Sequence, residues 1–144
     1  MDRALHFSSG KDDWETPDAL FAKYDAIYHF VLDAAANEIN HKCACWYGPG
    51  GEAEDALALS HWKRKGCVWL NPPYSRGLQA KFVIKAAQES RPGESVVCLL
   101  PARTDTKLFH DVIWPHGQVE FLRGRVRFKG APAPAPFPSM IVVF

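Results

Sequence analysis

The sequence predicts an α/β fold in which a mostly parallel sheet lies between two layers of helices. Through most of the chain, apolar strand-like runs alternate with amphipathic helix-like stretches, and such alternation produces parallel strands joined by helices. The chain then closes with "QVEFL", "RVRF" and "SMIVVF", which have no helix between them and favour an antiparallel addition to the sheet. A length of 144 residues is enough for one core, so residues 1–144 are expected to form a single three-layer αβα domain with antiparallel C-terminal strands.

The first half of the chain predicts one helix and two short strands. Thr16–Tyr28 has the pattern of a helix, because Thr16 can cap it, Pro17 fits its first turn and apolar residues then recur at helical spacing. His29–Leu32 is predicted to be a buried strand that runs into small residues, and Lys42–Tyr47 a second strand. The glycine-rich "GPGGEAED" that follows is expected to be a loop.

Predicted strands and helices alternate more clearly in the second half of the chain. Val68–Leu70 is predicted to be a strand, residues 77–90 an amphipathic helix, and residues 94–101 a continuous apolar strand of the kind that is buried on both faces. Residues 104–114 are expected to form a further helix. The proline-rich "APAPAPFP" at residues 131–138 predicts an extended loop of polyproline character.

The charge balance changes along the chain. Residues 1–60 hold 4 Lys and Arg against 11 Asp and Glu, whereas residues 61–144 hold 13 against 5, so a polyanion would bind to the second part. Arg123, Arg125 and Arg127 occupy every second position, which would place them on one face of a strand. The alternative is that they are solvated charges that protect the edge of a sheet. No apolar run is long enough to span a membrane and the start has no signal-peptide core, so the protein is expected in the cytoplasm.

The four cysteines suit reduced, buried thiols better than a disulfide framework, because three of them lie in apolar strand-like runs. His41 stands close to Cys43 and Cys45, a combination that suggests zinc. A Cys-x-Cys pair on a strand points both thiols to one face, however, and no second ligand pair with zinc-like spacing follows. We therefore expect no metal site.

The stretch "VWLNPPYS" gives the clearest functional hypothesis. In this stretch a predicted strand is followed directly by Asn71, Pro72, Pro73 and Tyr74. Ligands of α/β sheets bind beyond the carboxyl ends of the parallel strands, which is where these residues are expected to lie. The amide of Asn71 offers an acceptor, Pro72 has a carbonyl without an N–H, and Tyr74 offers a flat face. Two acceptors above an aromatic ring suit a planar heterocycle that bears an amino group, whereas a proline-stiffened Asn turn is the structural alternative.

The tetrapeptide Asn71-Pro72-Pro73-Tyr74 resembles the catalytic motif of S-adenosylmethionine-dependent amino-methyltransferases. Around it, "DWETPDALF", "LDAAANEINHKC", "EDALALSHW", "LLPARTDTKLFHD" and "FLRGRVRF" follow in an order that closely resembles the phage and prophage DNA N-6-adenine-methyltransferase family. The resemblance covers nearly the whole chain. It implies a Rossmann-like class I methyltransferase fold, S-adenosylmethionine as cofactor, double-stranded DNA as partner, and methylation of the N6 amine of adenine.

The resemblance also implies three groups of cofactor-binding residues. The Thr-Pro motif and the preceding Trp match residues that flank the methionine end of the cofactor. The acid at the end of the first strand and the small residues after it match the loop that meets the cofactor's ammonium group. The third group consists of the Asn after that loop, the acid before the tetrapeptide and the Asn of the tetrapeptide itself. Together the three groups comprise Trp14, Thr16, Pro17, Asp33, Ala34, Ala35, Asn40, Asp55 and Asn71.

Structural alternatives stand beside several of these roles. Thr16 is also a good helix cap, and Asn40 can simply close a turn. Asp55 can be an acid at the start of a helix instead of the acceptor for the cofactor's adenine amine. The loop after Asp33 has alanines where the family usually has Gly-x-Gly.

DNA contacts are expected from the second half of the chain. Arg103 and Thr104 follow the end of a strand and would line the base or phosphate channel, with a helix cap as the alternative. The three alternating arginines and the polar residue after the proline-rich loop are candidates for contacts to the DNA backbone. The full set is Arg76, Arg103, Thr104, Arg123, Arg125, Arg127 and Ser139. A homodimer is a further hypothesis, because so small an enzyme has little surface with which to grip a duplex.

The residues imply a mechanism for an amine whose lone pair is delocalised into a ring. If the Asn71 Oδ1 and the Pro72 carbonyl each accept one N–H, the nitrogen is drawn toward tetrahedral geometry and its developing charge is stabilised. A base in a duplex must be flipped out to reach them, with Tyr74 as a stacking surface. Methylation of RNA adenine or of a protein glutamine amide is an alternative, as is a catalytically inactive DNA-binding remnant.

Overall fold

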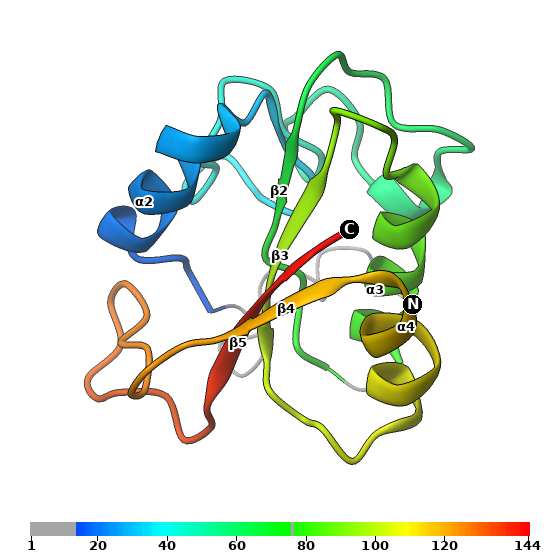
Figure 1. Cartoon of the computed structure of the whole chain (residues 1–144). Coiled ribbons are helices and arrows are strands. Elements are labelled where there is room, and N and C mark those ends of the chain that lie inside the picture. Colours follow the sequence, from blue (N-terminus) through cyan, green and yellow to red (C-terminus); the bar gives the residue numbers. More distant parts are fainter. Residues whose placement is uncertain (1–13, 76) are drawn as a thin grey trace.

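The computed structural model describes residues 14–75 and 77–144. It contains a five-stranded sheet with helices on either side and long connecting loops (Figure 1). The strands are β1 (Leu32–Asp33), β2 (Val68–Leu70), β3 (Val96–Pro101), β4 (Gln118–Phe121) and β5 (Ser139–Val143). The helices are α2 (Asp18–Tyr28), α3 (Leu78–Glu89) and α4 (Trp114–His116), with a short 3-10 helix η1 (Ala56–Ala58) and a π-helical turn η2 (Phe109–Ile113).

The sheet has the strand order β1-β2-β3-β5-β4 and divides into a parallel and an antiparallel part. β1 runs parallel to β2 and β2 parallel to β3, whereas β5 lies antiparallel between β3 and β4. The antiparallel C-terminal addition is therefore confirmed. The predicted strand Lys42–Tyr47 is absent, so the parallel part consists of β1, β2 and β3 alone.

Both faces of the sheet are covered. On one face Trp69 belongs to a hydrophobic cluster that includes Tyr24 of α2, and on the other Leu70 packs in a cluster with Phe82 of α3. Neighbouring residues of a strand thus go to opposite faces, as the pleat requires. All six residues of β3 are buried, which confirms the prediction of a strand covered on both sides. Figure 1 shows the same arrangement, with α2 on one side of the strands and α3 and α4 on the other.

Most of the second half of the chain follows the prediction. β2 has the predicted bounds, and α3, β3, β4 and β5 lie within the predicted ranges. The predicted helix at residues 104–114 starts late and consists largely of η2, which runs directly into α4. Near its start, Thr106 Oγ1 accepts the Phe109 N–H at 3.1 Å, a capping role that was the alternative for Thr104.

Two predicted strands of the first half are wrong in extent or in kind. His29 is the C-cap of α2 in the left-handed conformation, with φ 52°, so β1 begins only at Leu32. The segment Lys42–Tyr47 makes only isolated bridges, one of them between Trp46 and Asp33. Its first backbone N–H bonds to the Asp33 carboxylate at 2.9 Å, so a side chain satisfies a donor that a strand would have used.

The predicted strand "RVRF" is also wrong, since residues 125–128 have irregular backbone. The Val126 carbonyl accepts the Ala135 N–H at 2.8 Å, which ties this segment to the proline-rich loop. Prolines lack the N–H that a ladder needs, so the pairing cannot extend into a sheet. The proline-rich segment itself is a loop, as predicted.

All four cysteines are free thiols, as expected, although only Cys43 and Cys98 are buried. His41 stacks on Trp46 with ring centres 4.0 Å apart, and its Nδ1 lies 2.8 Å from the Cys43 carbonyl oxygen. Within residues 14–75 and 77–144, no three His, Cys, Asp or Glu side chains gather as a metal site would require. No helix in the same residues is long and apolar enough to cross a membrane.

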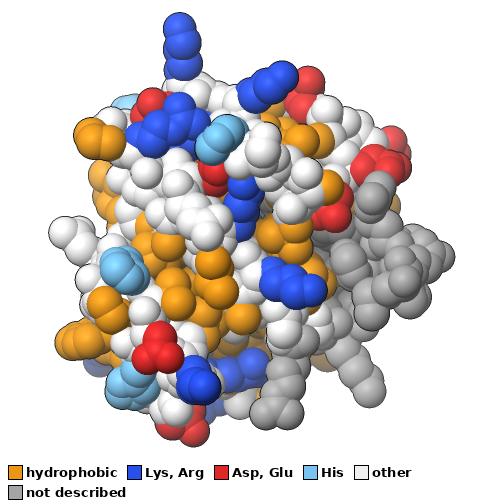
Figure 2. All heavy atoms as spheres, turned by 90° about the vertical axis from the view of Figure 1, so that its right-hand side faces the viewer, with side chains coloured by type: hydrophobic (Ala, Val, Ile, Leu, Met, Phe, Trp, Pro, Cys, Tyr) orange, Lys and Arg blue, Asp and Glu red, His pale blue; other side chains and the backbone are white. Residues whose placement is uncertain are grey.

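The outer surface of α3 and α4 is partly apolar. Figure 2 shows hydrophobic side chains between charged groups on this side of the molecule. Ile84 is 42% exposed and Trp114 is 62% exposed. A shallow groove between Ile84, Val112 and Phe144 belongs to this surface.

A buried carboxylate anchors α3 to the loop before β2. Glu89 accepts the Trp62 N–H at 2.8 Å and the Lys85 ammonium at 3.1 Å. The Arg64 guanidinium lies 3.7 Å from this carboxylate and also donates to the Glu89 carbonyl. Burial raises the pKa of Glu89, but the hydrogen bonds from Trp62 and Lys85 outweigh it and hold the pKa below its usual range. The cluster fixes the segment that leads into β2 and so to Asn71.

Glu89→Gln is expected to destabilise the fold, because it leaves Arg64 and Lys85 without their charge partner. We expect the free energy of unfolding at pH 7 to fall by about 2–4 kcal/mol in a denaturant titration. The depressed pKa of Glu89 contributes stability above its ordinary value of 4.5, and this contribution is lost as the pH falls through the folded-state pKa. The difference between the two proteins should therefore shrink in acid. Gln88→Ala on the same helix is the control, and an equal loss there would contradict the role of Glu89.

Candidate active site

Asn71 lies directly after β2, at the carboxyl end of the parallel strands, and is followed by the buried Pro72 and Pro73. Its Nδ2 donates to the Trp14 carbonyl oxygen and, at 3.0 Å, to Thr16 Oγ1. Its Oδ1 is buried and has no hydrogen-bond partner in the described part of the chain. A buried acceptor without a donor costs about 1–3 kcal/mol. The arrangement is therefore suited to receive an N–H or O–H group from a ligand.

Thr16 contacts Asn71 and does not cap α2. The helix begins at Asp18, with Pro17 at its N-cap position and no side-chain hydrogen bond at the cap. The prediction that Thr16 caps the helix is therefore wrong. Pro17 is extended, with ψ 137°, and a proline also restricts the residue before it to extended backbone. The chain consequently passes beside the end of β2 before it turns into the helix.

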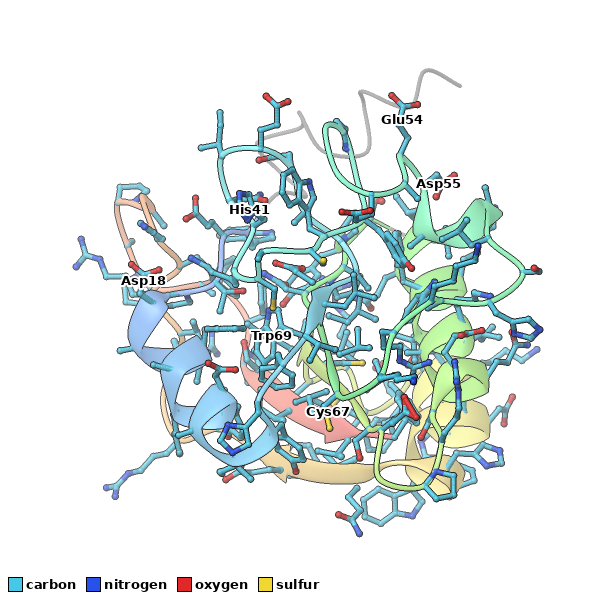
Figure 3. All side chains as sticks on the ribbon, turned by 90° about the horizontal axis from the view of Figure 1, so that it is seen from above. Asp18, His41, Glu54, Asp55, Cys67 and Trp69 are labelled. Atoms are coloured by element: carbon cyan, nitrogen blue, oxygen red, sulfur yellow. The ribbon has the colours of Figure 1, made fainter. Side chains whose placement is uncertain are left out.

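Two loops hold the segment that precedes α2. Lys42 Nζ lies 3.4 Å from the Glu15 carboxylate and 2.8 Å from the Asp18 carboxylate. Lys129 Nζ contacts the same two carboxylates at 3.6 and 3.2 Å, and its backbone N–H donates to the Glu15 carbonyl at 2.9 Å. Figure 3 shows Asp18 at the start of α2, where these contacts meet. They hold in place the two acceptors that bind the Asn71 amide.

Tyr74 lies in an aromatic cluster. It is 5% exposed, and its hydroxyl donates to the Leu99 carbonyl at 2.9 Å. Its ring meets Phe128 and Phe137 at steep angles, with centres 6.2 and 5.6 Å apart, and the Trp14 ring contacts the same two phenylalanines. The sequence predicted an open stacking face at Tyr74. The structure covers this ring, because the proline-rich loop places Phe137 against it.

Asp33 ends β1 and is 3% exposed. Its Oδ2 accepts the Lys42 N–H at 2.9 Å and its Oδ1 the Ala35 N–H at 3.4 Å. Burial raises the pKa of this carboxyl to about 7, although both hydrogen bonds and the Lys42 charge oppose the shift. Ala34 and Ala35 are buried as well, and the Ala34 N–H donates to the Trp69 carbonyl of β2 at 3.0 Å. A cation beside Asp33 would stabilise its ionised form.

Asn40 and Asp55 have the structural roles that were given as alternatives to cofactor binding. Asn40 Oδ1 accepts the Asn37 N–H at 2.8 Å, and Asn37 Oδ1 accepts the Asn40 N–H at 3.0 Å, so the pair closes a turn. Asp55 Oδ1 accepts the Leu57 N–H at 3.0 Å and caps η1. Figure 3 shows Asp55 and Asp18, at the start of α2, on opposite sides of Trp69 of β2. Asp55 therefore lies apart from Trp14 and Thr16, which contact Asn71.

A cavity of about 610 Å³ borders Tyr74 at the carboxyl ends of β2 and β3. Arg103 lines it, as do Lys107 and Gln79, whereas Thr104 is exposed. The Nε2 of Gln79 is buried and without a hydrogen-bond partner among the described residues, so it is a second polar atom at this end of the sheet that lacks a partner. Sequence reasoning did not single out Gln79 or Lys107, because each is one polar residue in an amphipathic stretch.

The predicted DNA-binding residues near the C-terminus differ in exposure. Arg123, Arg125 and Arg127 are exposed but stand on irregular backbone, so the prediction that they share one strand face is wrong. Arg125 and Arg127 each donate at 3.4 Å to a carbonyl of the loop that follows them. Ser139 is 1% exposed, because it starts β5, which lies between β3 and β4 in the sheet. Arg76 lies outside the described residues.

Comparison with known proteins assigns the family. Residues 5–138 match the sequence model of the family described as DNA N-6-adenine-methyltransferase (Dam). This chain belongs to the Dam family. The resemblance indicated by the tetrapeptide and its flanking motifs is therefore confirmed.

Named relatives of this Dam family member come from phages and from a bacterium. The DNA N-6-adenine-methyltransferase of Escherichia phage T1 is 37% identical over 101 residues, which are 69% of this chain and 40% of that protein. The protein of the same name from Haemophilus phage HP1 is 35% identical over 104 residues, 70% of this chain and 56% of that one. Putative methyltransferase YfdM of Escherichia coli K12 is 36% identical over 69 residues, 44% of this chain and 71% of that protein. The chain thus spans about half the length of the two phage proteins.

Asp33→Asn is expected to remove a pH dependence of folding. The carboxyl has a pKa of about 7 when folded and 3.8 as its ordinary value, so its contribution to stability is full below 3.8 and is lost as the pH rises through 7. Between pH 5 and pH 8 we expect the wild type to lose roughly 2–3 kcal/mol more than Asp33→Asn in the free energy of unfolding. Denaturant titrations at both pH values measure this. Asp111→Asn, at an exposed position, should behave as the wild type, and equal pH dependence in all three proteins would contradict a pKa of Asp33 that is raised by burial.

Proposed function

We propose that this chain methylates the exocyclic N6 amine of adenine in double-stranded DNA, with S-adenosylmethionine as methyl donor. The observation that carries the proposal is the buried Oδ1 of Asn71, left as an acceptor by the hydrogen bonds of its Nδ2. Membership of the Dam family and the names of the two phage relatives support it. In this proposal residues 1–144 form one Rossmann-like class I methyltransferase domain, which agrees with helices on both faces of the parallel strands β1, β2 and β3.

The residues at the carboxyl ends of β1 and β2 suit S-adenosylmethionine by charge. When bound, this cofactor supplies a methyl group on a positively charged sulfur. Asp33 offers a buried carboxyl whose pKa is raised by burial, and a neighbouring positive charge would relieve that penalty. In our proposal Asp33, together with Trp14 and Pro17, holds the methionine part, and Ala34 and Ala35 close the loop behind it. Asp55 is the candidate acceptor for the amine of the cofactor's adenine.

Asn71 and Pro72 supply acceptors for the amine of the target base. Asn71 Oδ1 has a fixed direction, and Pro72 has a carbonyl but no N–H to compete for it. Together they accept both N–H groups of the target, draw its nitrogen toward tetrahedral geometry and stabilise the positive charge that develops there. Because the fold already orients the Asn71 dipole, little reorganisation is needed when that charge appears.

The target base has to leave the duplex to reach these acceptors. In our proposal it enters beside Tyr74, next to the cavity that Arg103 and Lys107 line. Stacking on an aromatic ring of this kind contributes about 1–3 kcal/mol. Since Phe137 stands against the Tyr74 ring, with centres 5.6 Å apart, stacking requires the proline-rich loop to move when DNA binds.

DNA is preferred over other amine-bearing substrates for two reasons. RNA adenine and a protein glutamine amide present a similar –NH₂ group, but the family relatives carry DNA in their names and the second half of the chain is basic. An inactive DNA-binding remnant would not need a buried acceptor that is held ready by hydrogen bonds. We place the reaction in the cytoplasm of the host cell, with Arg123, Arg125 and Arg127 on the DNA backbone.

Asn71→Ala is expected to slow methylation strongly, with a residual rate, and without loss of DNA affinity. Removal of one oriented acceptor should lower kcat by about 100-fold or more. The assay transfers a labelled methyl group to duplex DNA, RNA or a protein extract, and nucleoside analysis by mass spectrometry identifies N6-methyladenine. Gln88→Ala is the control for an exposed amide. Label in RNA or protein alone would overturn the DNA assignment, and full activity of Asn71→Ala would overturn the site.

Arg123→Gln, Arg125→Gln and Arg127→Gln are expected to weaken binding to DNA of any sequence to the same degree. Each lost phosphate contact should make the plot of log affinity against log salt shallower by about 0.9. Fluorescence anisotropy with two unrelated duplexes over a series of salt concentrations measures this slope. Lys23→Gln, an exposed site on α2, matches the change in charge and should leave the slope unchanged. The proposed DNA face is wrong if all four variants share one slope.

A further inference from the structure

Thr16 has a contact that its motif did not predict. The resemblance to the family assigns the Thr-Pro motif to the methionine end of the cofactor. In the structure Thr16 Oγ1 lies 3.0 Å from Asn71 Nδ2 and accepts one of its hydrogens. The residue is 3% exposed. Its hydroxyl is therefore enclosed beside the side chain that carries the proposed chemistry.

The Trp14 carbonyl decides which way the Asn71 amide points. A backbone carbonyl can only accept, so the amide atom that faces it is Nδ2, and Oδ1 takes the opposite edge. A hydroxyl alone would not decide, because it can donate or accept. With one hydrogen on the Trp14 carbonyl, the other reaches Thr16 Oγ1. Both donors of Asn71 are thus engaged, and Oδ1 is left buried and facing away from them.

The segment that carries both acceptors is itself held firmly. The Trp14 ring packs on Phe128 and Phe137, with centres 5.3 and 5.5 Å apart. The next residue, Glu15, accepts the Lys129 N–H through its carbonyl at 2.9 Å. These contacts tie the segment to the chain around the proline-rich loop. The acceptors therefore have a defined position relative to β2 before any ligand binds.

We propose that Thr16 is a positioning residue that, together with the Trp14 carbonyl, holds Asn71 Oδ1 in its direction and acts on the transfer step, not on cofactor affinity. This rests on the proposed function, in which Oδ1 accepts an N–H of the target adenine. Without the Thr16 hydroxyl, one Asn71 hydrogen loses its acceptor and only the bond to the Trp14 carbonyl is left, so the amide rotates more readily about its last torsion. Oδ1 then leaves the direction in which it meets the amine, and misplacement of this kind slows catalysis.

Thr16→Val and Thr16→Ser separate this role from cofactor binding. Thr16→Val keeps the shape of the side chain and removes the hydroxyl, so we expect kcat to fall about 10-fold, as the loss of one hydrogen bond predicts. The Kd of S-adenosylmethionine, measured by calorimetry, should change by less than about twofold, and Thr16→Ser should recover most of kcat. If Thr16→Val instead weakens the cofactor about 10-fold at unchanged kcat, Thr16 is a cofactor ligand and the proposal fails.

The Asn71→Ala background provides a further check on the same step. Thr16→Val should have no added effect on the residual rate there, because the group that it positions is gone. An effect of the same size in both backgrounds would show that Thr16 acts through something other than Asn71. Thr16→Ala compared with Thr16→Ser gives the same contrast if Thr16→Val folds poorly.

A measurement without methylation keeps the two proposals distinct. In ¹⁵N-labelled protein, the side-chain amide signals of Asn71 are identified by their loss in Asn71→Ala. We expect these hydrogens to exchange with water about 5-fold faster in Thr16→Val than in the wild type or Thr16→Ser, as the loss of one hydrogen bond implies. Equal exchange in the three proteins would overturn the positioning role. If the exchange of the Asn71 amide depends on Thr16 but the chain methylates no DNA, the proposed function fails and the positioning role stands.

Discussion

The amide of Asn71 is held by residues from a distant part of the chain, and the candidate site depends on that contact. Its Nδ2 bonds to Trp14 and Thr16, which lie 57 and 55 residues earlier in the sequence. β2 delivers Asn71 to the edge of the sheet, and the aromatic cluster around Phe128 and Phe137 holds the Trp14 segment against it. A change that loosens either partner therefore alters the direction of Oδ1, even where it touches no ligand.

The same edge of the sheet keeps two unfavourable features in the free protein. Asn71 Oδ1 is a buried acceptor without a donor, and Asp33 is a buried carboxyl whose pKa is raised to about 7. Each feature costs stability when the site holds no ligand. Under the proposed function each becomes favourable on binding, because the target amine brings a donor to Asn71 and the cofactor brings positive charge near Asp33. Under that proposal, the stability that these two features cost is offset when ligands bind.

Local patterns predicted those parts of the structure that local physics decides. β2 and α3 follow from apolar runs and helical periodicity, and the tetrapeptide at the end of β2 was sufficient to locate the candidate site. The failures have non-local causes. Thr16 has the residue type of a helix cap, yet its hydroxyl bonds to a side chain more than fifty residues away. The apolar segment Lys42–Tyr47 has the composition of a strand, but the Asp33 carboxylate takes its first N–H. Neither partner is visible in a sequence window.

A crystal structure with a DNA duplex that the chain methylates and an unreactive cofactor analogue tests the central claim most directly. The account predicts a flipped adenine whose N6 lies about 2.7–3.2 Å from both Asn71 Oδ1 and the Pro72 carbonyl oxygen. It also predicts that Asn71 Nδ2 keeps its bonds to the Trp14 carbonyl and Thr16 Oγ1. An N6 that meets other acceptors, or an Asn71 amide turned so that Oδ1 no longer faces the base, would contradict it.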